Sequence, residues 1–132
     1  MKHKVIQSNV PINGRIYSED TLKSQIGKTV PVVKYFKTDE PIGKATMVSQ
    51  TEANIEITDK DVIENLMDGS LVTVSAGTGN IEEKDGLMYV KDYDLSMVSI
   101  IRKENSALPY HGNNDAEKLK MLSEKLKQQT EL

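Results

Sequence analysis

Ser75 is the residue whose type and position are best suited to covalent chemistry. It follows the apolar run 71–74, which predicts a strand, and it precedes a small residue and a glycine, so its hydroxyl would lie at a strand end. An ordinary strand-end serine is the alternative interpretation. A serine hydroxyl becomes strongly nucleophilic only beside a general base, and we expect the two histidines, His3 and His111, to lie in terminal or flexible segments.

The sequence holds few groups that could bind a metal or a cofactor. It has no cysteine, which excludes thiolate zinc sites, disulfide bonds and a cysteine nucleophile. Asp92 and Asp94 would share one face of a predicted strand, where a solvated face explains them better than a structural metal. Gly77 and Gly79 lack the lysine of a phosphate loop, so we interpret them as a turn or flexible loop. We therefore predict no metal and no cofactor.

Composition predicts one domain with an aliphatic core. The 132 residues are 37% hydrophobic but only 5% aromatic, so the core must come from the valine and isoleucine runs. A net charge of −3, from 17 basic and 20 acidic residues, gives no support for nucleic acid as a partner. No apolar run is long enough for a signal sequence or a membrane span, so we expect a soluble protein made in the cytoplasm, without a membrane partner.

The pattern of apolar residues predicts clustered strands and two helices. Helices are expected over 18–26 and 59–68, where Ser18 and Asp59 are suitable N-caps. Strands are expected over 3–7, 29–34, 41–57 (with breaks), 71–75, 87–93 and 97–101, with a hairpin-type turn at Lys84-Asp85-Gly86. The fold class predicted is α+β: a mostly antiparallel, barrel-like β-sheet of about six or seven strands, with two flanking helices and a C-terminal helical appendage.

The last part of the chain differs in character from the rest. Residues 109–114 are polar, contain Pro and Gly, and predict a hinge between a domain, 1–108, and a charged helical appendage, 115–132. That appendage carries a narrow apolar stripe at helical spacing, which we expect to bind another subunit, formed by Leu119, Leu122 and Leu126. A solvated, partly frayed helix is the alternative.

Four segments follow one another in a recognisable order. They are 13–17 (NGRIY), 30–44 (VPVV to PIGK), 72–77 (VTVSAG) and 95–107 (LSMVSII to NSA). In order and spacing these segments resemble the tailed-phage prohead protease family, the phage relatives of herpesvirus assemblin. The resemblance spans about residues 10–108. It implies the fold of a maturation endopeptidase with a catalytic Ser, His and acidic residue.

The resemblance assigns the nucleophile position to Ser75, but the two other catalytic positions carry unsuitable residues. Phe36 stands where the family has its His, and Met97 stands where the family has its acidic residue. Phe cannot accept a proton, and Met cannot orient an imidazole. We expect Phe36 and Met97 to pack near Ser75 as an apolar filling of the former site. A Ser-Lys dyad is an alternative, with its base chosen from Lys34, Lys37 and Lys44.

These observations predict a capsid-assembly protein that keeps the protease scaffold and lacks protease activity. Its expected partners are the major capsid protein or other head proteins, and we expect a homo-oligomer or several copies in each head. Its expected locations are the phage head and the cytoplasm of the bacterial host. The alternatives are an active capsid maturation serine endopeptidase that uses Ser75, and a small β-rich binding domain unrelated to capsids.

Overall fold

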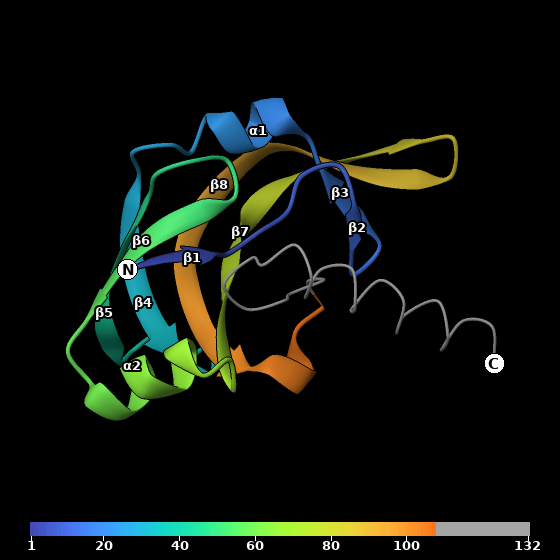
Figure 1. The fold of residues 1–132 in the computed structure, drawn as a ribbon. Coiled ribbons are helices and arrows are strands. Elements are labelled where there is room, and N and C mark those ends of the chain that lie inside the picture. Colours follow the sequence, from blue (N-terminus) through green and yellow to red (C-terminus); the bar gives the residue numbers. More distant parts are fainter. Residues whose placement is uncertain (108–132) are drawn as a thin grey trace, which may run out of the picture.

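The structure is a computed structural model in which residues 1–107 are described (Figure 1). The elements are β1 (Lys2–Lys4), β2 (Pro11–Ile12), β3 (Arg15–Tyr17), α1 (Glu19–Lys23), β4 (Thr29–Lys34), β5 (Pro41–Met47), β6 (Glu52–Ile57), α2 (Lys60–Met67), β7 (Leu71–Lys84), β8 (Leu87–Arg102) and a 3-10 turn, η1 (Lys103–Asn105). The predicted hinge 109–114, the appendage 115–132 and its leucine stripe lie outside the described residues.

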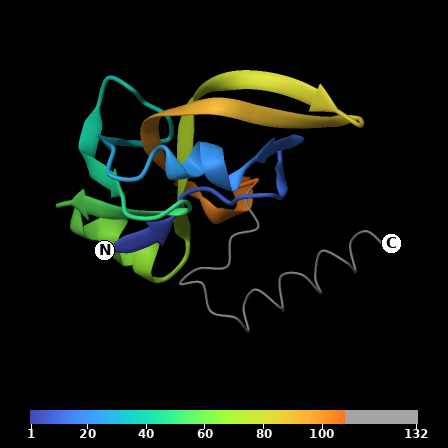
Figure 2. The same ribbon diagram turned by 90° about the horizontal axis from the view of Figure 1, so that it is seen from above.

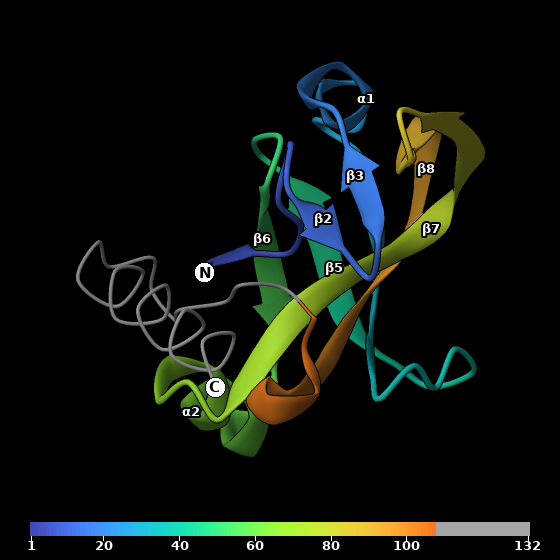
Figure 3. The ribbon, with the colours of Figure 1, turned by 90° about the vertical axis from the view of Figure 1, so that its right-hand side faces the viewer.

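The strands form one curled sheet in the order β1-β6-β5-β4-β8-β3-β2, and β7 pairs with the other edge of β8. All pairs are antiparallel except β3 with β8 and β4 with β8. The two helices lie at opposite ends of this sheet (Figure 3). The predicted α+β class, with a mostly antiparallel, barrel-like sheet and two helices, is therefore confirmed for residues 1–107.

The curl of the sheet brings β7 back to the N-terminal segment. The Ser75 N–H donates to the Val5 carbonyl at 2.8 Å, and the Thr73 hydroxyl donates to the Lys4 carbonyl at 3.0 Å. Inside the curl lies an aliphatic core, as composition predicted, and its members Val32, Val98 and Ile100 are fully buried. The first strand is therefore part of the folded body, and its short length does not leave the N-terminus loose.

One stretch of β8 lies between β3 and β4 and obtains its backbone partners from side chains. The Tyr93 N–H donates to Thr21 Oγ1 at 3.0 Å, and the Leu95 N–H donates to Gln25 Oε1 at 2.9 Å. Both acceptor side chains are buried, and they belong to α1 and to the turn that follows it. Because a buried N–H without a partner is costly, these two side chains connect the helix to the sheet.

Replacing Gln25 by Met should therefore destabilise the fold. Met has a similar length but leaves the Leu95 N–H without an acceptor, so the free energy of unfolding should fall by about 1–3 kcal/mol. Urea denaturation measures this change. The matched control is Lys23→Met on the exposed face of α1, which should change stability by less than about 0.5 kcal/mol. Equal effects of the two substitutions would contradict the assignment.

Both helices begin where the sequence predicts. The Ser18 hydroxyl accepts from the Thr21 N–H at 3.2 Å, and the Asp59 carboxylate accepts from the first backbone N–H groups of α2. The first helix is shorter than predicted, ending at Lys23, because the residues after it form turns that lead to Gly27 with φ +90°. These turns bring Gln25 to β8, so a tertiary contact overrides the apolar helical spacing.

The strands differ from the prediction mainly in length. The stretch 41–57, in which breaks were predicted, forms β5 and β6, whereas β7 and β8 are longer than predicted. The interpretation of Gly77 and Gly79 as a turn or loop is wrong, because both lie within β7. A Cβ at Gly77 would lie 2.2 Å from the Asp94 carbonyl oxygen, so glycine permits a close approach of the two strands at a bulge.

The β7–β8 hairpin extends beyond the body of the sheet as an arm (Figure 2). Its turn is the predicted one: Asp85 and Gly86 both have positive φ, and Lys84 pairs with Leu87. Near the end of the arm, Ile81, Leu87 and Met88 are exposed. Among residues 1–107, no helix has the length and hydropathy required to cross a membrane.

Candidate functional site

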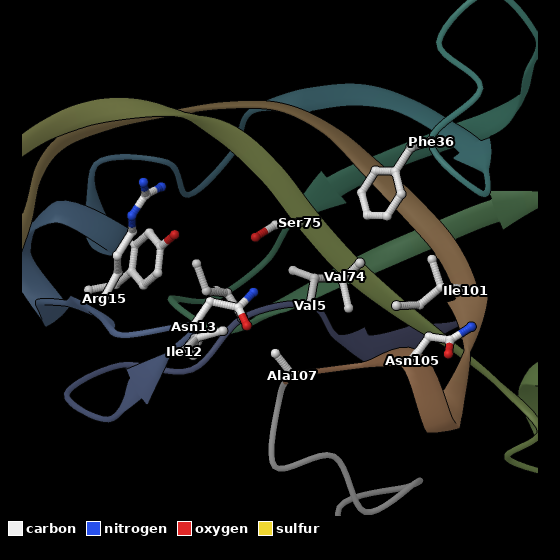
Figure 4. Close-up of a pocket in the computed structure, with 12 residues that line it drawn as sticks. Val5, Ile12, Asn13, Arg15, Phe36, Val74, Ser75, Ile101, Asn105 and Ala107 are labelled. Atoms are coloured by element: carbon white, nitrogen blue, oxygen red, sulfur yellow. The ribbon is translucent and has the colours of Figure 1, made fainter.

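A cavity of about 320 Å³ lies beside Ser75, between β7 and the N-terminal segment (Figure 4). All four segments that carry the family resemblance contribute to its wall or rim. Its apolar lining residues are Val5, Ile6, Ile12, Phe36, Val74, Ile101 and Ala107. Its polar lining residues are Asn13, Arg15, Tyr17, Ser75 and Asn105.

The hydroxyl of Ser75 accepts a hydrogen bond from a buried tyrosine. Tyr93 Oη donates to Ser75 Oγ at 3.2 Å, and the Tyr93 ring meets the Tyr17 ring edge-on, with centroids 5.1 Å apart. Burial raises the pKa of Tyr93 to about 12, while the hydrogen bond to Ser75 opposes this increase. Tyr93 is therefore a neutral phenol at physiological pH. It donates a proton to Ser75 in a hydrogen bond and is too weak a base to activate it.

The raised pKa of Tyr93 predicts a loss of stability in alkali. Because the folded state holds this proton more tightly than the unfolded chain does, stability is unaffected below pH about 10, the usual tyrosine pKa. It should fall by about 2–3 kcal/mol as the pH rises from about 10 to about 12. Urea midpoints of the wild type and of Tyr93→Phe, measured across this range, test the prediction. The variant should lack this part of the decline, and an identical decline in both proteins would contradict it.

Phe36 lies at the rim of the cavity, in a strained turn between β4 and β5. Tyr35 and Phe36 both have left-handed backbones, with φ of 52° and 59°, which is uncommon for aromatic residues. The turn is held by hydrogen bonds from the Tyr35 N–H to the Ile100 carbonyl and from the Phe36 N–H to the Ser99 hydroxyl, both 2.9 Å. The Phe36 side chain remains 51% exposed. Phe36 is thus held at the site by backbone contacts, and its side chain is only partly packed.

Met97 takes a different position. In the β7–β8 ladder Ser75 pairs with Val98, and Met97 pairs with Ala76. Neighbouring strand positions point to opposite faces of a sheet, so the side chains of Met97 and Ser75 point away from each other. The structure therefore brings Phe36 and Ser75 to one cavity but leaves Met97 outside its lining. The apolar filling expected from Met97 is not found there.

The described lysines do not supply a base for Ser75, since none of them lines the cavity. Lys44 pairs with Glu56 at 3.4 Å, and Lys34 Nζ lies 5.6 Å from the centroid of the Tyr35 ring. Within residues 1–107, the cavity lining also contains no carboxylate and no histidine. His3 lies in a terminal segment as expected, but that segment is not flexible, because His3 is buried in β1 opposite Ala53, where burial lowers its pKa.

Several residues of the site were not predicted as functional. Arg15 and Tyr17 belong to the NGRIY segment, but their side chains were given no role. Asn105 follows the last strand, and it meets the cavity only because η1 turns the chain back. Tyr93 has no sequence signal at all, because its contact with Ser75 joins positions 18 apart on two different strands. No metal-binding group of three or more His, Cys, Asp or Glu residues occurs in the described part.

Comparisons with protein-family models, with curated proteins and with solved structures find no match to this chain. The residues around Ser75 and the four segments that resemble prohead proteases are therefore the features that bear on function.

Proposed function

We propose that this chain is a capsid-associated assembly protein of a tailed phage, built on a prohead-protease-like scaffold without protease activity. One observation carries the proposal: the four segments that resemble the family, although spread over residues 13–107, all contribute residues to one cavity beside Ser75. Short motifs that match by chance have no reason to converge on one site. Their convergence supports a common origin for the cavity and the active site of the protease family.

The chemistry of the cavity supports the loss of activity. Ser75 Oγ accepts a hydrogen bond from a neutral phenol, and the residue at the histidine position, Phe36, has no proton acceptor. A serine hydroxyl without a base has little reactivity toward an amide. The scaffold then serves as a docking body for the major capsid protein or other head proteins, in several copies per head. The chain acts in the host cytoplasm during assembly and in the head afterwards.

Isolation of empty precursor heads from infected cells tests this proposal. The chain should copurify with them at a fixed ratio to the major capsid protein, and quantitative mass spectrometry measures that ratio. A low, variable ratio that falls further on each round of purification would instead identify a contaminant and contradict the role in assembly.

A further inference from the structure

Among residues 1–107, Arg15 is the one charged residue in the wall of the cavity beside Ser75. Arg15 forms no ion pair with another residue of that described part. It lies in β3 two positions before Tyr17, so the two side chains share one face of the strand. Burial raises the pKa of Tyr17, and the positive charge of Arg15 opposes this increase. The guanidinium therefore acts electrostatically on a group that lines the cavity, and its charge is not neutralised by a described carboxylate.

Neutral polar side chains in the same wall have hydrogen-bonding groups without a partner among the described residues. These are the side-chain amides of Asn13 and Asn105 and the hydroxyl of Tyr17. An amide side chain both donates and accepts hydrogen bonds, and a phenol hydroxyl can do the same. The cavity therefore offers a ligand one cation together with neutral donors and acceptors.

The charged end of the cavity is separated from an apolar end. Figure 4 shows Arg15 and Asn13 toward one end and Phe36 and Ile101 toward the other, with Ser75 between them. The volume of about 320 Å³ is at the small end of the range found for ligand sites. A matching occupant is therefore small and combines one anionic group with one apolar group.

We propose that the cavity binds the C-terminal residue of a peptide, with its free carboxylate at Arg15 and an apolar side chain near Val74 and Phe36. A guanidinium can bind a carboxylate through two parallel hydrogen bonds, which an uncharged chain end does not reproduce. A peptide also carries an amide group, whose N–H and C=O suit the two asparagine side chains, whereas a simple carboxylic acid carries none. The inference goes beyond the proposed function, because it uses only the lining residues and holds whether or not the protein acts in a capsid.

Binding of three related probes to the whole chain tests the inference without any substitution. The first probe is the N-acetylated tripeptide Ala-Ala-Leu with a free carboxyl group, and the second is the same tripeptide with a C-terminal amide. The third is 4-methylpentanoate, which keeps the carboxylate and a leucine-like apolar group but has no peptide bond. Isothermal titration calorimetry measures the dissociation constants. The free acid should bind at least about tenfold more tightly than either other probe, since each of those lacks one of the matched groups.

A pair of arginine variants assigns the preference for the free acid to one residue. Arg15→Met keeps an unbranched side chain and removes the charge, so it should weaken binding of the free acid about tenfold and abolish its advantage over the amide. Arg102→Met is the matched control, because Arg102 is exposed and lies outside the cavity lining, and it should leave binding unchanged.

Several results would overturn the inference. In the wild type these are no binding of the free acid, or equal affinities for the acid and the amide. Equal affinity for 4-methylpentanoate would show that the site takes a simple carboxylic acid and would overturn the assignment to a peptide. An unchanged preference in Arg15→Met, or equal losses in the two arginine variants, would show that Arg15 does not bind the carboxylate.

Discussion

Ser75 is expected to stay unlabelled when the folded protein is treated with a fluorophosphonate probe. The probe reacts with serines whose proton is removed by an adjacent base, and the described groups around Ser75 supply none. Tyr93 donates to the serine oxygen, and its pKa of about 12 keeps it protonated. Labelling should be slower than that of an active serine hydrolase by about three orders of magnitude or more.

Two variants control the labelling experiment. Ser75→Ala should give the same background signal as the wild type, since neither protein has an activated serine. His111 lies outside the described residues, so His111→Ala tests whether it supplies a base. It should also leave the signal unchanged. Stoichiometric labelling of the wild type that disappears in Ser75→Ala would instead support the active endopeptidase.

Replacing the three leucines of the predicted appendage by serine should abolish incorporation into heads. A helix of this length is marginal alone in water and gains most of its stability from burying its apolar stripe. Each leucine would contribute up to about 1.5–3 kcal/mol if buried in a partner, so the loss of Leu119, Leu122 and Leu126 removes most of the binding free energy. The ratio of this chain to the major capsid protein in purified particles measures the effect.

The same triple variant should keep the melting transition of the wild type, because we expect the aliphatic core described in residues 1–107, built from the sheet and both helices, to decide that transition. A matched control replaces the opposite face of the predicted helix by serine, at Lys120, Glu124 and Gln128. The control should still enter heads. Loss of cooperative melting in the leucine variant would show that the stripe belongs to the domain's own core.

Local signals predicted the fold well where a few neighbouring residues decide the structure. Ser18 and Asp59 cap their helices through their own side chains, and the turn at Asp85 and Gly86 follows from residues that accept positive φ. Local signals failed where contacts with residues far away in the sequence decide the structure. Gln25 leaves the helical pattern to accept a hydrogen bond from β8, seventy positions away in the chain.

The two glycines that follow Ser75 in β7 show the same limit of prediction from local sequence. A Gly-x-Gly sequence fits both a loop and a close strand crossing, and only the Asp94 carbonyl beside Gly77 distinguishes them. The register of the β7–β8 pair shifts beside these glycines, and Tyr93 of β8 donates a hydrogen bond to Ser75 of β7. The order of the motifs therefore predicted that Ser75 and Phe36 belong to one site. The hydrogen bond between the Tyr93 and Ser75 hydroxyls could not be predicted from the sequence.

We propose that the chain is a lasting, non-catalytic part of the head. Intact-mass spectrometry of precursor heads and of mature, DNA-filled heads tests it most directly. We predict that the uncleaved chain is present in both, at the same ratio to the major capsid protein. A chain found in precursor heads that is absent from mature heads, or is present there only as fragments, would contradict the claim and indicate a protease that destroys itself.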